Sequence, residues 1–110
     1  MHYPVLLDSV LQYLAIRPDG IYADATAGLG GHTAAIAARL TTGTVIVCDR
    51  DEESLEIARR NTAHLAGRIR FEQARFSELR AALSRAGAAR VDGLLADLGA
   101  SRFQLTNPAR

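Results

Sequence analysis

The stretch Asp24-Ala-Thr-Ala-Gly-Leu-Gly-Gly-His32 decides the fold of this chain. It follows an apolar segment, residues 21–23, that predicts a short strand, and it leads into residues whose apolar side chains repeat with helical spacing. A glycine-rich turn from strand to helix lets a ligand approach the backbone closely, and the first N–H groups of the helix favour negative charge. Three glycines and one acidic residue therefore predict a cofactor site, with a plain strand–helix turn as the alternative.

Strands and helices are predicted to alternate along the rest of the chain. Apolar runs predict further strands at 44–48, 69–73 and 91–96, and helical spacing predicts helices over 7–14, 32–40, 51–66 and 77–86. This order, with short connections, predicts an α/β fold with a parallel sheet and right-handed crossovers. Ligands of such sheets bind beyond the carboxyl ends of the strands, which is where the glycine-rich stretch falls.

Size and composition are those of one small globular domain. The chain has 110 residues and a net charge of +1, which neither favours nor excludes a nucleic-acid partner. All thirteen basic residues are arginine, and the single cysteine, Cys48, is expected to be a small buried hydrophobe. With no signal peptide and no apolar run of membrane-spanning length, we expect a cytoplasmic protein without a membrane partner. No metal site is predicted.

Candidate site residues stand at the ends of the predicted strands. Asp49 can accept hydrogen bonds from ribose hydroxyls, or it shares the cap of the next helix. Phe76 lies against an adenine ring or belongs to the core. Asp24 orders the glycine turn or meets an ammonium group of the ligand. His32 bonds the ligand or the turn, or has no site role, and Asp97 ends the fourth strand.

The spacing of the glycines bears on the choice of cofactor. The dinucleotide fingerprint places a third glycine where this chain has Thr33, for close packing of helix on strand beside a pyrophosphate. Adjacent Gly30 and Gly31 instead suit a ligand with a small carboxylate tail. The pattern therefore favours S-adenosylmethionine, while NAD stays open.

Six segments together resemble the bacterial small-subunit ribosomal RNA (cytosine-N4)-methyltransferase family, in order and over essentially the whole chain. They are His2-x-Pro-Val-Leu-Leu7, Arg17-Pro-Asp-Gly-x-Tyr22, Asp24-Ala-Thr-x-Gly-x-Gly-Gly-His32, Asp49-Arg-Asp51, Val91-Asp-Gly-x-Leu95 and Asp97-Leu-Gly-x-Ser101. The resemblance implies a Rossmann-like methyltransferase fold and methyl transfer from S-adenosylmethionine to the exocyclic amine of a cytidine in 16S rRNA. The partner would be that RNA or the small ribosomal subunit.

The same resemblance implies which residues contact the cofactor. By position these are Gly30, Gly31, His32, Asp49, Phe76, Asp97 and Gln104, to which the glycine-turn argument adds Asp24 and Gly28. The chain departs from the usual family pattern at Arg102, Phe103 and Thr106, which alters the shape of the pocket. The family continues well beyond residue 110, so residues 1–110 are interpreted as the N-terminal, cofactor-binding half of a class I methyltransferase domain, with strands 1–4 present and the C-terminal half missing.

Asp97 is the candidate catalytic residue. An acceptor near the cytosine amine would localise its lone pair and take up developing positive charge, although a purely cofactor-binding carboxylate is equally compatible. A non-catalytic S-adenosylmethionine-binding module or remnant, and an NAD-dependent dehydrogenase, are the alternative functions. The fourth strand, 91–96, is expected at an exposed edge of the sheet, which predicts a homodimer through that edge.

Overall fold

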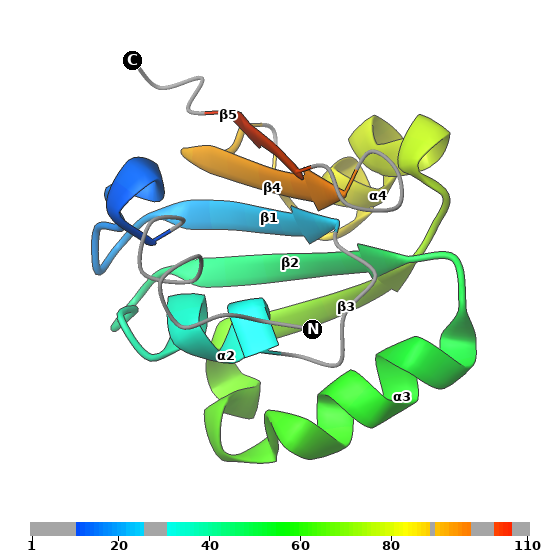
Figure 1. Ribbon diagram of the computed structural model, residues 1–110, viewed down its shortest axis with the longest axis horizontal. Helices are drawn as coiled ribbons and strands as arrows, with labels where there is room; N and C mark the ends of the chain where they lie inside the picture. The colour runs from blue at the N-terminus through cyan, green and yellow to red at the C-terminus, as the bar shows by residue number, and fades with distance from the viewer. Residues whose placement is uncertain (1–10, 26–30, 89, 98–102, 107–110) are drawn as a thin grey trace.

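A five-stranded sheet forms the centre of the molecule (Figure 1). The computed structural model describes residues 11–25, 31–88, 90–97 and 103–106. The strands are β1 (Ile21–Ala25), β2 (Thr44–Asp49), β3 (Ile69–Gln73), β4 (Gly93–Asp97) and β5 (Phe103–Thr106), in the spatial order β3-β2-β1-β4-β5. The first four are parallel to their neighbours, as predicted, and β5 runs antiparallel to β4.

The helices connect the parallel strands. They are α2 (Gly31–Ala37), α3 (Glu52–Asn61) and α4 (Leu79–Arg85), with 3-10 helices η1 (Ala63–Arg68) and η2 (Phe76–Glu78), and residues 11–14 are also helical. Among the described residues, no helix combines the length and apolar character needed to cross a membrane.

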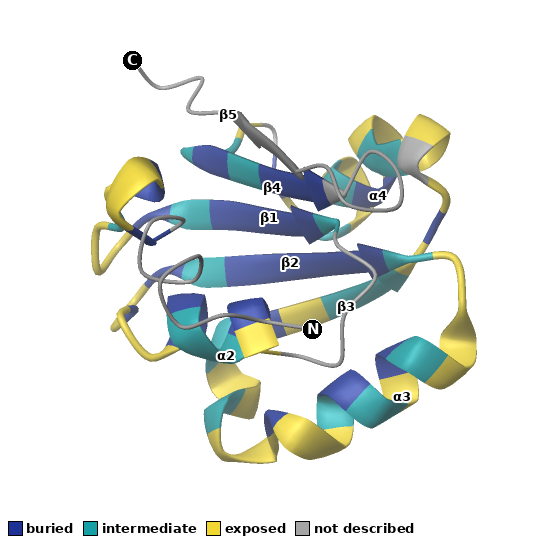
Figure 2. Ribbon diagram, viewed as in Figure 1, coloured by how far each residue is buried: buried dark blue, intermediate teal, exposed yellow. Residues whose placement is uncertain are grey.

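Two apolar clusters pack the two faces of the sheet. Because side chains alternate along a strand, Val45 and Val47 of β2 face the cluster formed with α2 and α3, whereas Ile46 and Cys48 face the cluster formed with α4. Figure 2 shows the resulting pattern, with buried strands at the centre and exposed positions along the outer sides of the helices. β2 is thus covered on both faces, as its unbroken apolar run predicts.

The predicted helices differ from the observed ones mainly at their ends. α2 ends at Ala37, and the helix predicted over 51–66 ends at Asn61. There the Thr62 hydroxyl donates to the Ala58 carbonyl oxygen over 2.7 Å and Thr62 has non-helical φ and ψ of −118° and 20°. The prediction that Asp51 caps α3 is confirmed, since its carboxylate accepts from the N–H of Glu53.

Corrections of the same kind apply to α4 and β4. The predicted cap at Ser77 is wrong, because α4 begins at Leu79 and its N-cap is Glu78, which makes no side-chain capping bond. The Glu78 carboxylate instead accepts from the N–H of Arg75 over 2.9 Å. β4 begins at Gly93, two residues later than predicted.

The expected exposed edge at strand 91–96 is wrong. β5 pairs with β4 along its length, from Leu94 opposite Thr106 to Asp97 opposite Phe103. The residues after β4 form a fifth strand by turning back on it, so β4 is an inner strand of the sheet. The homodimer was predicted from unpaired backbone groups along that edge, and the pairing with β5 removes this basis for it.

Hydrogen bonds accepted by Asp92 join two loops at the amino end of the sheet. Its Oδ2 accepts from the Ile21 N–H over 2.8 Å, and its Oδ1 pairs with the Arg17 guanidinium over 2.7 Å. The Arg17 N–H in turn donates to the Tyr22 hydroxyl over 2.8 Å. These contacts fix the start of β1 beside the start of β4.

The connection between α2 and β2 packs on the same end. The Pro18 carbonyl oxygen accepts from the N–H groups of Thr41, Thr42 and Gly43, over 2.8, 3.2 and 3.0 Å. The backbones are so close that a Cβ on Gly43 would lie 2.2 Å from the Gly20 carbonyl oxygen. Glycine is required at position 43 by this close approach.

Candidate functional site

The glycine-rich stretch connects the carboxyl end of β1 to the start of α2. β1 ends at Ala25 and α2 begins at Gly31, which is exposed. The predicted contacts Gly28 and Gly30 lie outside the described residues. The two elements that flank the glycine-rich stretch, the end of β1 and the start of α2, lie at the edge of the sheet where ligands of parallel α/β folds bind.

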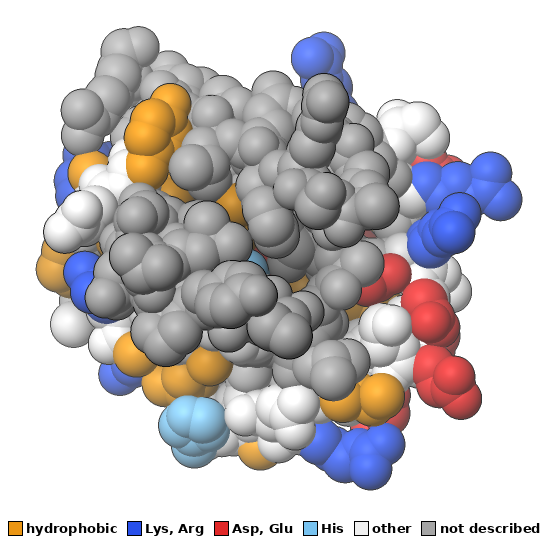
Figure 3. All heavy atoms as spheres, viewed as in Figure 1, with side chains coloured by type: hydrophobic (Ala, Val, Ile, Leu, Met, Phe, Trp, Pro, Cys, Tyr) orange, Lys and Arg blue, Asp and Glu red, His pale blue; other side chains and the backbone are white. Residues whose placement is uncertain are grey.

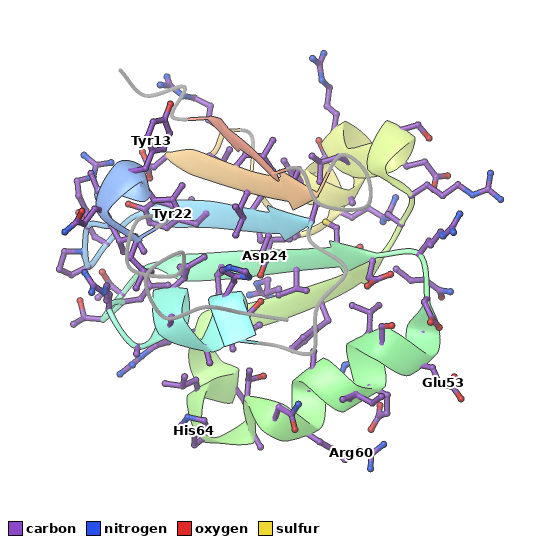
Figure 4. The ribbon with its side chains drawn as sticks, viewed as in Figure 1. Tyr13, Tyr22, Asp24, Glu53, Arg60 and His64 are labelled. Carbon is purple, nitrogen blue, oxygen red and sulfur yellow. The ribbon has the colours of Figure 1, made fainter. Side chains whose placement is uncertain are left out.

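A buried hydrogen bond joins these flanks. The Thr33 hydroxyl, in the first turn of α2, donates to Asp24 Oδ2 in β1 over 2.6 Å. The two residues are 1% and 2% exposed. A buried carboxylate is tolerated only with partners of this kind. Figure 4 shows Asp24 between the sheet and the start of α2. Asp24 thus joins the end of β1 to the first turn of α2, and its predicted ordering of the glycine turn stays a prediction.

His32 is the second residue of α2 and is buried. The residue is only 3% exposed. A direct contact of His32 with a ligand stays a prediction.

The carboxylates of Asp49 and Asp51 both accept hydrogen bonds at the start of α3. Asp49 Oδ1 accepts from the Asp51 N–H over 2.9 Å, while Asp51 caps α3 through the Glu53 N–H and the Ser54 hydroxyl. Asp49 is half-buried, and among the described residues nothing donates a hydrogen bond to its Oδ2. That oxygen is able to accept a bond from a ligand hydroxyl, while the bond of Oδ1 to the Asp51 N–H fits the alternative in which Asp49 shares the start of α3. Contact of Asp49 with a ribose stays a prediction.

Strand register brings the predicted residues to one edge of the sheet. Asp24 lies opposite Val47 of β2 and Leu95 of β4, so Asp49 and Asp97 each follow two residues further on, one on either side of β1. Gln104 of β5 lies opposite Ala96. Phe76 begins η2 after β3. The side chains of Phe76, Asp97 and Gln104 lie outside the described part, so their ligand contacts stay predictions.

Cys48 precedes Asp49 but faces the other side of the sheet, where it packs with the α4 cluster. Burial, together with the nearby carboxylates of Glu72 and Asp24, raises the pKa of its thiol to about 11. The thiol is therefore neutral at physiological pH and behaves as the small buried hydrophobe expected from the sequence.

The charged side chains of the described residues form no single basic patch on the face shown in Figure 3. Arginine side chains there stand at separate places around the rim, and acidic ones lie close to them on the right. Some arginines serve the fold itself: Arg85 pairs with Glu72 over 3.1 Å, and Arg68 donates to the Ala37 carbonyl oxygen. In the described parts of the chain, no cluster of three or more His, Cys, Asp or Glu side chains could hold a metal ion.

The hydrogen-bond partner of Asp24 was not predicted from the sequence. Thr33 drew attention only because it breaks the dinucleotide fingerprint, whereas the structure makes it the partner of Asp24. The sequence did contain a signal for this bond: Thr33, with its hydroxyl, lies in the first turn of the helix that follows the strand carrying Asp24.

Comparison with known proteins identifies the relatives of this chain. The model of the MraW methylase family matches residues 1–110. Ribosomal RNA small subunit methyltransferase H of Solibacter usitatus is 58% identical over 110 residues, which are all of this chain and 38% of that protein. The chain thus spans well under half the length of this relative.

Solved structures share the fold. TrmN from Thermus thermophilus superimposes with a TM-score of 0.69 at 31% identity, over 89% of this chain and 29% of TrmN. An O-methyltransferase from Bacillus cereus, solved in complex with SAH, gives a TM-score of 0.71 at 20% identity over 88% of this chain and 46% of its own. The Rossmann-like methyltransferase fold is thereby confirmed, and the dehydrogenase alternative loses its support. With the full-length family match and the shared fold, this chain belongs to the MraW methylase family.

Proposed function

We propose that this chain is the S-adenosylmethionine-binding part of a small-subunit rRNA methyltransferase that acts on the N4 amine of a cytidine in 16S rRNA. The observation that carries the proposal is the glycine-rich connection of β1 and α2, tied at its flanks by Asp24 and Thr33, with Asp49 at the next strand end. Membership of the MraW methylase family and the name of the Solibacter usitatus relative support the reaction class.

The residues at this edge fit the cofactor. Asp49 Oδ2 offers an acceptor for a ribose hydroxyl, and the exposed Gly31 lets a carboxylate tail approach the backbone at the start of α2. Thr33 stands where a dinucleotide site has its third glycine. Gly28, Gly30, His32, Phe76 and Gln104 complete the proposed set of contacts.

Asp97 has the proposed catalytic role. When bound, S-adenosylmethionine supplies a methyl group on a sulfonium that is already a good leaving group. The chain must therefore position the cytosine amine and raise its nucleophilicity, since the ring delocalises its lone pair. A carboxylate at the end of β4, next to the glycine turn, would accept an N4–H and take up the positive charge that develops on nitrogen.

Calorimetry with S-adenosylmethionine, SAH and NAD tests the binding function. We expect the first two to bind and NAD to bind more weakly, because Thr33 occupies the position of the third dinucleotide glycine. Tighter binding of NAD would contradict the proposal.

Labelled-methyl transfer to small ribosomal subunits that lack the modification tests the reaction. We expect transfer by the chain joined to the remainder of the Solibacter usitatus relative, with N4-methylcytidine as the product in digested RNA, and none by these 110 residues alone. Turnover by the 110 residues, abolished by Asp97→Ala, would show that they suffice. Absence of transfer by the joined protein would favour the alternative, a non-catalytic S-adenosylmethionine-binding module.

A further inference from the structure

The bond between Thr33 and Asp24 spans the glycine turn. It joins the fourth of five residues of β1 to the third residue of α2, over 2.6 Å and nine positions of sequence. Both side chains are almost fully buried. A short hydrogen bond in a region from which water is excluded therefore joins the two flanks.

A hydroxyl donor matters more here than at the surface. The acceptor is a carboxylate, and hydrogen bonds to charged groups are stronger than those between neutral groups. Valine has nearly the shape of threonine but cannot donate, so it would leave the buried Asp24 one bond short. The first turn of α2 and the end of β1 would then be held less firmly.

The far end of α2 is held by other contacts. Arg68 Nη1 donates to the Ala37 carbonyl oxygen over 3.3 Å, and residues 41–43 bind the Pro18 carbonyl oxygen. The apolar residues Ile36, Ala37 and Leu40 also pack in the core. Loss of the Thr33 hydroxyl should therefore disturb the start of the helix and leave its packing on the sheet in place.

We infer that Thr33 is a positioning residue of the cofactor site, whose hydroxyl fixes the two flanks of the glycine turn before the cofactor binds. This inference rests on the proposed S-adenosylmethionine-binding function. In the dinucleotide fingerprint, a glycine at this position lets the helix pack closely on the strand. In this chain, the Thr33 hydroxyl instead connects α2 to β1 by its hydrogen bond to Asp24.

Three variants of the chain test the inference by calorimetry with SAH. Thr33→Val removes the donor, Thr33→Ser keeps it, and Thr62→Val is a matched control, because Thr62 is equally buried and donates to the Ala58 carbonyl oxygen over 2.7 Å at the end of α3. We expect affinity to fall about tenfold in Thr33→Val, to stay within about threefold in Thr33→Ser, and to stay unchanged in Thr62→Val. Thermal unfolding of each variant measures the purely structural cost.

A second measurement uses the unaltered chain. By NMR, the Thr33 hydroxyl proton should exchange slowly with water in the cofactor-free protein, unlike that of the exposed Thr42. Exchange as fast as that of Thr42 would overturn the inference even if Thr33→Val failed to fold. Wild-type affinity for SAH in Thr33→Val would also overturn the inference but would leave the proposed function intact. Failure of the unaltered chain to bind SAH would overturn both the proposed function and the inference.

Discussion

At the amino end of the sheet, Asp92 uses both carboxylate oxygens to join loops of the protein, whereas at the carboxyl end Asp49 leaves Oδ2 without a donor among the described residues. Both acids belong to segments that resemble the same family, Val91-Asp-Gly and Asp49-Arg-Asp51. We therefore expect the motif at the amino end to have a structural role and the motif at the carboxyl end to bind the ligand. Variants at the two ends should accordingly separate stability from binding.

The largest effect is expected from Gly43→Ala at the amino end. The new Cβ would lie 2.2 Å from the Gly20 carbonyl oxygen, a backbone atom that cannot move aside without shifting β1. We expect the free energy of unfolding to fall by about 3 kcal/mol in urea denaturation. The control is Gly67→Ala, where a Cβ meets nothing within 4 Å, and a change below about 0.5 kcal/mol is expected. Equal stability of the two variants would contradict the packing described.

Asp49→Ala should act on binding at the carboxyl end. Loss of a hydrogen bond to a charged acceptor should weaken S-adenosylmethionine binding by about 1.5–3 kcal/mol in calorimetry. Asp51→Ala is the matched control, since it removes the cap of α3 and should cost about 1 kcal/mol of stability with affinity unchanged. Unchanged affinity in Asp49→Ala would remove this residue from the proposed site.

Asp92→Ala should show the opposite behaviour. It leaves the partly buried Ile21 N–H without the carboxylate that it binds over 2.8 Å, so we expect a loss of about 1.5 kcal/mol in the free energy of unfolding. Arg17→Gln removes only the ion pair, in which the arginine side chain is 62% exposed, and should cost less than about 1 kcal/mol. Neither change should alter cofactor affinity, and a clear drop in affinity would show that the two ends are coupled.

Titration of Cys48 has no effect on stability at neutral pH and acts on it only at high pH. Its pKa is raised from 9.0 to about 11 in the folded protein, so between these values the unfolded chain loses the thiol proton first. The contribution of the thiol to stability is full below pH 9 and is lost as pH rises toward 11. Urea denaturation of the wild type should show this loss relative to Cys48→Ala. Parallel pH profiles of the two proteins would argue against burial of the thiol.

The sequence alone determined the parallel α/β order, the inward positions of α2, the cap of α3 and the methyltransferase resemblance. Each depends on residues a few positions apart: apolar spacing of 2 or 3.6 residues, an acidic cap, and glycines between strand and helix. The same local patterns placed Asp24, Asp49 and Asp97 at strand ends, and the observed register brings those ends together.

Only the tertiary structure decided which segments pair and which side chains meet. The antiparallel return of β5 onto β4, the bond from Thr33 to Asp24, and the contact of Asp92 with Ile21 join residues that no local pattern connects. Periodic patterns depend on residues that are close in the sequence. These contacts instead form when folding buries polar groups, because buried polar groups need hydrogen-bond partners, here from other parts of the sheet.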